Sequence, residues 1–368
     1  MKSIIVNDPV SYVPEKIKGI MITGLLTLSK SNFAYPPEIA KEIKRLVGNY
    51  MFELPLDFYT LLKTDRQRAY SMIKEFDDKI TAISLNFARN HDWNILAPIF
   101  TSTDRLQHFL WHDEEYMVKL YRELDGRLKY FLDIVSAEDA NMIVLSDHGF
   151  GPYGHAFFIN TWLHRNGYQK RNKNIPLSLL SAFGLTRTRL IKVLNRMHLF
   201  NTVRSIAVSK GLDELGRFYD KQMDYKRSLA YALSNYGIYV NDKSNRGERD
   251  EIIESIKEGL YKIKDNDSQV IRKVHRREEV LWGPYVDRAP DLFVDTCEGY
   301  EILHYSSSDE FGKPADLSKG LAVRTGAHRP EGIFLAYGSD IRSGSVLEQP
   351  IHTWDITPTI LHMLSISI

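Results

Sequence analysis

The sequence predicts an α/β protein built around a mostly parallel sheet, and three observations lead to this class. Short apolar runs with strand-like composition alternate along the chain with longer segments of helical periodicity. Acids and histidines directly follow some of the apolar runs, as in open α/β sheets that bind ligands at the carboxyl ends of their strands. The chain has 368 residues, enough for a large core with an inserted cap.

The first elements follow from composition and spacing. The run Ser3-Ile-Ile-Val-Asn7 predicts a strand, and the stretch after it, rich in Pro, Gly and Ser up to residue 37, predicts a loop. Helices are expected over residues 64–90 and 113–136. The second helix is well marked, because acidic residues gather at its amino end and apolar residues recur every three to four positions.

Two segments place an acid and a histidine together at predicted element boundaries. Asp104 and His108 stand four residues apart at the start of a predicted helix, so both side chains project from one face. Asp147 and His148 directly follow Met142-Ile-Val-Leu145, a continuous apolar run that predicts a strand buried on both faces. We therefore expect all four side chains at one rim of the sheet.

A third histidine segment completes the pattern. His328 lies in a Gly-Ala-His-Arg-Pro turn before Gly332-Ile-Phe-Leu-Ala336, which predicts another strand. Carboxylate oxygen with imidazole nitrogen is a ligand set of zinc, manganese or iron, and the single Cys297 leaves few thiolate alternatives. Each fragment alone is explained as well by chance, by a helix cap or by a loop histidine. Their joint occurrence favours a divalent-metal hydrolytic site.

These motifs resemble the type I phosphodiesterase/nucleotide pyrophosphatase branch of the alkaline phosphatase superfamily. The resemblance is carried by Thr103-Asp-Arg-Leu-Gln-His108, Leu145-Ser-Asp-His-Gly-Phe-Gly151, Ile159-Asn-Thr-Trp-Leu163, Ala289-Pro-Asp291, His328-Arg-Pro-Glu-Gly332 and Asp355-Ile-Thr-Pro-Thr-Ile-Leu361. It implies an alkaline-phosphatase-like three-layer αβα sandwich with an inserted helical cap. It also implies hydrolysis of a small-molecule phosphate ester or diester by two-metal catalysis, with two divalent ions, zinc or manganese.

The resemblance also assigns the ligands to two metal sites. Asp104, His108 and His328 would bind one ion, while Asp147 and His148 would supply half of the second site. One full site and half of another are therefore expected in this chain.

The nucleophile of the resembling family has no identified counterpart here. In that family an aspartate and a threonine or serine nucleophile precede the stretch that matches residues 1 to 24. Asp8, Ser11 and Thr23 are present, but they fit a later strand and loop of the family pattern. The catalytic nucleophile is therefore unknown, and direct attack by an activated water would give much weaker activity.

The family's amino-terminal part also supplies a central strand of the sheet, and a chain without it would have two apolar edges facing each other across a gap. Three explanations stay open. A separate amino-terminal polypeptide completes the site, the true start lies upstream of Met1, or the protein has repacked into a catalytically impaired relative that binds metal and phosphate esters. A phosphomutase shares the metal scaffold and the same missing nucleophile.

Composition narrows the class only a little. With 48 basic and 47 acidic residues the chain is nearly neutral, so no preference of the whole protein for polyanions follows. No window approaches the roughly 18 apolar residues of a membrane span. The start has too short an apolar run for a signal peptide, and the lone cysteine suits a reducing compartment, so a cytoplasmic location is expected.

Residues 169–225 interrupt the α/β alternation and predict a basic helical insertion within a core of residues 1–168 and 226–368. Nine basic residues and no acidic one lie between Lys170 and Lys210. A solvated basic face explains this segment as well as an anion-attracting wall over the active site does. Contact with nucleic acid or anionic lipid is a further alternative.

Three more residues are candidates for the site. Arg329 could contact a phosphate oxygen or form a salt-bridged turn with Glu331. His155 could face the substrate, although an exposed loop position explains it more simply. Asp291 follows Pro290 at a predicted strand start and could orient a ligand histidine.

Overall fold

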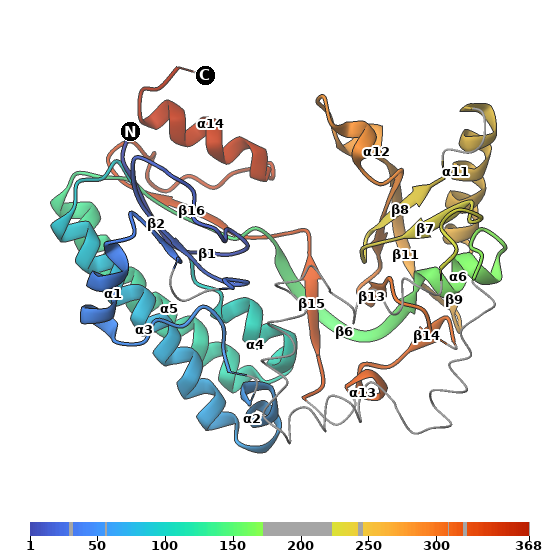
Figure 1. Cartoon of the computed structure of the whole chain (residues 1–368), viewed down its shortest axis with the longest axis horizontal. Helices are drawn as coiled ribbons and strands as arrows, with labels where there is room; N and C mark the ends of the chain where they lie inside the picture. The colour runs from blue at the N-terminus through green and yellow to red at the C-terminus, as the bar shows by residue number, and fades with distance from the viewer. Residues whose placement is uncertain are drawn as a thin grey trace. The chain divides into compact units, whose positions relative to one another are not determined.

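The computed structural model describes residues 1–28, 32–55, 57–171, 223–241, 246–307, 309–318 and 322–367, and Figure 1 labels their elements. The chain divides into two compact units. The first unit comprises Met1–Gly151 and Arg324–Ile368, and the second comprises Pro152–Val323.

A four-stranded sheet in the order β3-β2-β1-β4 forms one part of the first unit. Its strands are β1 (Ser3–Asp8), β2 (Gly19–Thr23), β3 (Ala34–Tyr35) and β4 (Ile95–Pro98). β1 pairs in parallel with β2 and β4, while β3 pairs with β2 in antiparallel. The strand predicted near residue 3 is confirmed. The loop predicted up to residue 37 is wrong where β2 and β3 form, because the apolar side chains of Ile20 and Ile22 are buried in the core.

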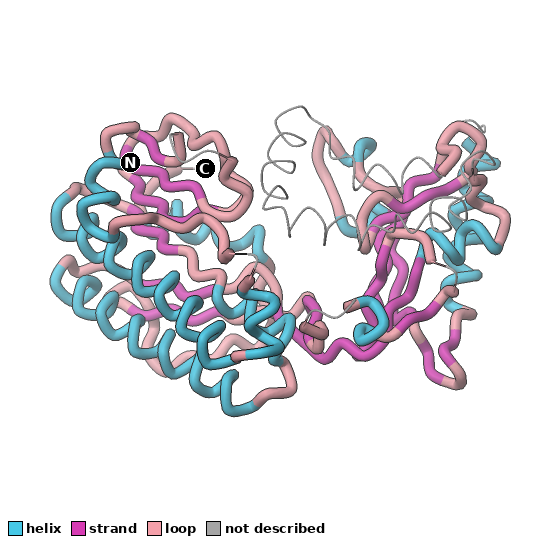
Figure 2. Tube along the Cα trace, turned by 60° about the horizontal axis from the view of Figure 1, so that its bottom comes forward, coloured by secondary structure: helices cyan, strands magenta, loops and turns pink. Residues whose placement is uncertain are grey.

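Helices alternate with these strands along the chain, and the long ones run beside them (Figure 2). Those of the first unit are α1 (Ile39–Val47), α2 (Phe58–Thr64), α3 (Arg66–Asn90), α4 (Ser102–Leu110), α5 (Glu114–Ala137) and α14 (Thr353–Met363). α3 and α5 confirm the two predicted helices. Each begins after an aspartate that caps the first turn, since Asp65 accepts from the Arg68 N–H and Asp113 from the Tyr116 N–H.

The strand predicted at Met142 is confirmed as β5 (Met142–Leu145), but its expected burial on both faces is wrong. β5 pairs only with β16 (Phe334–Tyr337), in antiparallel, among the residues that the structure describes. The side chains of β5 are half-buried, and Leu145 is 44% exposed. A continuous apolar run is therefore not covered by a second layer as it would be in a closed parallel sheet.

The second unit is built on two further sheets. The helices described in it are α6 (Ile159–Arg165), α11 (Arg246–Tyr261), α12 (Arg277–Val280), α13 (Pro314–Leu317) and a 3₁₀ turn at Val286–Arg288. One sheet has the order β11-β12-β8-β7, with β7 (Ala230–Ala232), β8 (Gly237–Val240), β11 (Ile271–Arg276) and β12 (Leu292–Thr296). The other has the order β13-β6-β14, with β6 (Gly149–Phe158), β13 (Gly299–Leu303) and β14 (Phe311–Gly312).

Smaller strands complete the structure. They are β9 (Lys264–Asp265), β10 (Ser268–Gln269) and β15 (Gly326–Arg329), the last of which pairs with β6. The core of the second unit contains the side chains of Trp162 and Leu163 from α6 and of Ile256 and Leu260 from α11. These apolar faces hold the helices against the sheet strands.

Most of the predicted insertion at 169–225 lies outside the described residues, so the predicted domain boundaries and the role of this segment stay predictions. Within the described ranges, no helix is long and apolar enough to cross a membrane.

Candidate metal centre

Helix α4 presents Asp104 and His108 on one face. Because these residues are four apart, one turn of helix brings Nε2 of His108 to 3.4 Å from Oδ1 of Asp104. The carbonyl oxygen of Gly326 lies 3.1 Å from Nδ1 of His108. NH2 of Arg324 also lies 2.7 Å from this nitrogen. The carbonyl accepts from a protonated Nδ1, which leaves the lone pair of Nε2 available to a metal ion, whereas the guanidinium only donates and pairs with the opposite tautomer.

His328 approaches α4 from β15, because the segment before it is fastened to the end of the helix. The Thr325 N–H donates to the His108 carbonyl at 2.8 Å, and the Trp111 N–H donates to Oγ1 of Thr325 at 3.1 Å. A Cβ at Gly326 would lie 2.2 Å from the Gln107 carbonyl oxygen, so this approach requires glycine. Nε2 of His328 consequently lies 2.9 Å from Oδ1 of Asp104 and 3.1 Å from Nε2 of His108.

His148 enters from the end of β5 and stacks on His328. The two imidazole rings are 3.7 Å apart between centroids and 20° from parallel. Nδ1 of His148 faces the Gly149 carbonyl oxygen at 3.1 Å, and its Nε2 lies 3.9 Å from Oδ1 of Asp104. Three segments that are distant in the sequence therefore direct imidazole nitrogens at one carboxylate.

The donor set fits a divalent cation. One ligand atom each from Asp104, His148 and His328 lies within 4.8 Å of the others. Mixed nitrogen and oxygen ligands at such a spacing suit zinc or manganese. Burial raises the pKa of Asp104, but hydrogen bonds from His108 and His328 and the positive charges of their imidazoles outweigh it and hold that pKa well below its ordinary value. The carboxylate is therefore ionised at neutral pH, as a metal ligand must be.

Comparison with protein families decides what kind of protein carries this cluster. The family model described as type I phosphodiesterase / nucleotide pyrophosphatase matches residues 4–320. The chain belongs to this family. The family is the one that the resemblance implied, and the described part of the chain has an α/β fold.

Solved structures give more distant likenesses. Human ectonucleotide pyrophosphatase/phosphodiesterase 5 is 17% identical, with 79% of this chain and 59% of that chain covered and a TM-score of 0.42. The murine protein of the same name is also 17% identical, with 79% of this chain and 60% of that chain covered and a TM-score of 0.41. Phosphonoacetate hydrolase from Sinorhizobium meliloti 1021 is 12% identical, with 93% of this chain and 67% of that chain covered and a TM-score of 0.42. The chain thus spans about three-fifths of the length of the two ectonucleotide relatives. No curated protein matches it.

In this family member all three candidate ligand histidines lie around Asp104. His148, expected with Asp147 at a second ion, lies within reach of Asp104 and His328, and its assignment to one ion or the other stays a prediction. The Asp147 side chain is 88% exposed, and its Oδ1 lies 3.8 Å from Nε2 of His148. Asp147 follows a strand that is itself only half covered, so nothing in the described structure holds its carboxylate inward.

Two residues beside the cluster were not expected from the sequence. The Phe150 ring lies 4.9 Å from the His108 ring and 5.1 Å from the His328 ring, so it forms an apolar wall next to both. NH2 of Arg324 lies 2.7 Å from Nδ1 of His108. Phe150 could have been proposed from its place directly after Asp147-His148-Gly149. Arg324 lies outside any motif, and only the docking of its segment on α4 brings it here.

The Arg329 side chain contacts the backbone of the residues near it. Its NH1 donates to the His328 carbonyl at 2.8 Å, and its side chain passes over Gly151, where a Cβ would lie 2.8 Å from Nε. The residue therefore lies next to the cluster, and contact with a phosphate oxygen stays a prediction.

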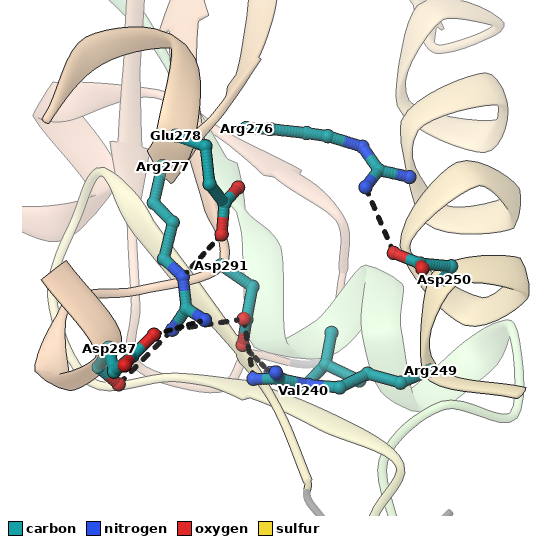
Figure 3. Close-up of polar contacts among 8 residues, drawn as sticks. All are labelled: Val240, Arg249, Asp250, Arg276, Arg277, Glu278, Asp287 and Asp291. Carbon is teal, nitrogen blue, oxygen red and sulfur yellow. Dashed lines mark hydrogen bonds and ion pairs between the residues drawn. The ribbon is translucent and has the colours of Figure 1, made fainter. Parts of the chain in front are cut away.

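Asp291 has partners other than a ligand histidine. It is 3% exposed. Figure 3 shows it between two arginines: Oδ1 lies 2.6 Å from NH2 of Arg249 and 3.5 Å from NH1 of Arg277. Oδ2 accepts from the Val240 N–H at 2.7 Å. These contacts join α11, α12 and β8 within the second unit and give Asp291 a structural task there, while the orientation of a ligand histidine stays a prediction.

His155 likewise lies in the second unit. Its Nδ1 lies 2.9 Å from Oδ2 of Asp265, which also accepts from the Tyr300 hydroxyl at 3.3 Å. The pairing with Asp265 gives His155 a structural partner, and its contact with a substrate stays a prediction.

The nucleophile expected by the family pattern is still not identified in the described residues. No serine or threonine hydroxyl there forms a hydrogen bond with Asp104, His108, His148 or His328. Thr23 is fully buried and donates to the Phe33 carbonyl, and Ser11 donates to the Asp8 carbonyl.

Proposed function

We propose that the chain is a divalent-metal-dependent phosphohydrolase of the phosphodiesterase/nucleotide pyrophosphatase type, acting on small phosphate diesters. The observation that supports it best is the convergence of Asp104, His148 and His328 on one point, in a member of a family named for this hydrolysis. His108, with Nε2 3.1 Å from that of His328, would be the fourth ligand. Zinc or manganese would act there as a Lewis acid that polarises the phosphoryl group.

The chain's own residues would divide the remaining tasks. Asp104 supplies the negative charge that offsets the cation, and the Gly326 carbonyl oxygen orients His108. Phe150 excludes water from one side of the cluster. Arg324 and Arg329 place positive charge beside it, which favours an anionic phosphate ester over a neutral ester.

A second ion would bind at Asp147 and His148 only with further oxygen ligands. The exposed carboxylate of Asp147 is free to turn toward such an ion, and the half site predicted from the sequence is retained as part of the proposal. Substrate contacts by Arg329 and His155, and the cytoplasmic location, are retained in the same way.

A second candidate is a relative that binds metal and phosphate esters without turnover. It is favoured by one observation, that no serine or threonine hydroxyl in the described residues contacts the histidine cluster. Turnover measurements separate the two. A phosphomutase would be recognised by an isomerised phosphate ester as product instead of free alcohol.

The test combines metal binding with hydrolysis of bis(p-nitrophenyl) phosphate. Zinc or manganese is titrated calorimetrically into the chelator-treated chain, and hydrolysis is followed with and without the ion. His328→Ala is expected to abolish tight binding and turnover, whereas His112→Ala, at an exposed position just after α4, is expected to change neither. Binding without turnover would favour the second candidate, and binding unchanged in His328→Ala would refute the ligand assignment.

A further inference from the structure

Helix α4 presents its two candidate ligands on a half-exposed face and packs its back into the core. Since each residue turns an α-helix by about 100°, Asp104 and His108 point about 40° apart, and Leu106 points to the opposite side. Leu106 is fully buried, and Leu110 is 4% exposed. Apolar packing of this kind is non-directional, so it holds the helix in place without setting how the helix is turned about its axis.

Two buried polar residues flank the ligand face of α4. Arg105 and Gln107 each lie about 80° from the middle of that face, on opposite sides of the helix. Their exposed fractions are 6% and 7%. A buried polar side chain must keep its hydrogen-bond partners, and these partners have to lie in particular directions. Such a pair therefore sets the rotation that the apolar back of the helix leaves open.

Arg105 has partners from three different segments. Its NH1 pairs with Oε1 of Glu53, in the loop between α1 and α2, and its Nε donates to Oγ1 of Thr101 at 3.2 Å. Its Cζ lies 5.5 Å from the ring centroid of Phe76 in α3. Oε1 of Glu53 also accepts from the N–H of the buried Leu54 at 3.1 Å, so the loop that carries this acid is itself anchored.

Gln107 is held on the other side of the ligand face by α5. Its Nε2 donates to the Tyr121 hydroxyl at 2.8 Å. Arg105 directly follows Asp104, and Gln107 directly precedes His108, so each candidate ligand on α4 has one of these two residues as its chain neighbour. The two contacts tie the same helix to different parts of the first unit, the loop before α2 and helix α5.

We propose that Arg105 and Gln107 are positioning residues, which fix the rotation of α4 and thereby direct its two candidate ligands. The inference rests on the proposed function only in taking Asp104 and His108 as metal ligands. Since side chains reach about 5–6 Å from the axis of a helix, a rotation by about 20° would move a ligand atom by about 2 Å. Metal–ligand distances tolerate only about 0.2 Å. A small turn of α4 would therefore separate its ligands from His328, whose Nε2 lies 2.9 Å from Oδ1 of Asp104.

Stability alone does not require an arginine at position 105. Replacing a buried ion pair by apolar residues of similar volume is often neutral or stabilising. The Glu53 side chain is 42% exposed, so water would hydrate its carboxylate in the absence of Arg105. A methionine at position 105 would therefore fill the space with little change in stability, while the directional contacts to Glu53 and Thr101 would be lost. This separation of stability from position makes the proposal testable.

The first measurement is hydrogen exchange of the full chain without metal, at the Thr325 N–H, which donates to the His108 carbonyl at 2.8 Å. In Arg105→Met this amide is expected to exchange faster, because a turned α4 carries its acceptor away, while the midpoint of urea unfolding stays close to the original value. Arg127→Met is the matched control, since Arg127 is a buried arginine of α5 that pairs with Asp78. It is expected to lower the urea midpoint without a selective change at Thr325.

The second measurement uses cobalt(II) as the probe, because its visible absorption spectrum depends on the number and geometry of its ligands. Arg105→Met is expected to change this spectrum and to weaken cobalt binding by roughly 10–100-fold. Tyr121→Phe removes the partner of Gln107 at a position that is 49% exposed, and a smaller change in the same direction is expected. Glu53→Gln keeps an oxygen that accepts from Arg105 and should retain the original spectrum. If Arg105→Met does not fold, Tyr121→Phe tests the proposal by both measurements.

Two results would overturn the proposal. One is an original cobalt spectrum and affinity in both Arg105→Met and Tyr121→Phe, and the other is an equal change in Arg127→Met and Arg105→Met. Either result would leave the proposed function standing, because the original chain would still bind the ion. If the original chain binds no cobalt, the proposed metal centre fails, and exchange at Thr325 in the metal-free variants decides by itself whether Arg105 and Gln107 hold α4 in its rotation.

Discussion

Nε2 of His328 lies 2.9 Å from Oδ1 of Asp104, although 224 positions separate the two residues in the chain. The contact joins β15 to α4 and is shorter than the contacts given above between any other two of Asp104, His108, His148 and His328. It makes Asp104 the shared acid of three imidazoles and the residue on which the proposed metal centre depends most.

Asp104→Asn is therefore expected to weaken zinc or manganese binding more than any single histidine change. Loss of an orienting partner typically costs roughly 10–100-fold in metal affinity, and loss of the charged ligand should cost at least about 100-fold. Calorimetric titration of the variant measures this. Asp113→Asn, which removes a carboxylate charge nearby in sequence but keeps an oxygen that caps α5, is the control and should leave affinity unchanged. Equal affinity in Asp104→Asn and the original chain would contradict the assignment.

Gly326→Ala should reduce metal affinity without touching a ligand. The new Cβ would lie 2.2 Å from the Gln107 carbonyl oxygen, so β15 must move off α4 and carry His328 with it. The matched control is Gly126→Ala on α5, where a Cβ meets nothing within 4 Å. That change should leave metal binding unaltered and stabilise the helix by roughly 0.5–1 kcal/mol. Thermal melts and metal titrations of both variants show whether Gly326→Ala weakens metal binding alone or destabilises the whole chain.

Asp291→Ala is expected to destabilise the second unit and spare the metal site. It leaves the guanidinium groups of Arg249 and Arg277 without their buried partner, and breaking a buried ion pair costs about 3–5 kcal/mol. Urea unfolding measures the loss, and metal titration at temperatures where the variant is folded measures the site. Weakened metal binding in the folded variant would instead support a role of Asp291 in orienting a ligand.

The stability of the chain should fall as pH rises from about 4 to about 6 because of Asp77. This carboxyl is buried in α3, and desolvation raises its pKa from 3.8 to about 6, although Ser102 and Arg127 beside it lower the pKa in part. The folded-state pKa is the higher one, so the folded chain binds this proton more tightly than the unfolded chain. Its favourable contribution is complete below about pH 4 and is lost above about pH 6.

Asp77→Asn should reduce that pH dependence. A shift of this size corresponds to about 3 kcal/mol, so the decrease in unfolding free energy between about pH 4 and pH 7 should be smaller by roughly that amount in the variant. Urea midpoints at the two pH values test it. Asp125→Asn, at an exposed position on α5, should show the original decrease, and the same decrease in Asp77→Asn would refute the explanation.

Local pattern was sufficient for part of this structure. Helical periodicity and amino-terminal acids placed α3 and α5, and the four-residue spacing of Asp104 and His108 correctly put both on one face of a helix. The family motifs led to the family that the comparison shows. These features depend on residues within a few turns of one another, which is the range over which propensity and spacing act.

The pairing of distant segments was decided by tertiary structure. The sequence by itself determined the candidate ligand residues, the family and the long helices. Only the fold decided that His148 stacks on His328, that Asp291 lies between two arginines, and that β5 is half exposed. Each of these features depends on which strands and loops lie side by side. Long-range packing and backbone pairing decide that arrangement, and the local periodicity of the sequence does not predict it.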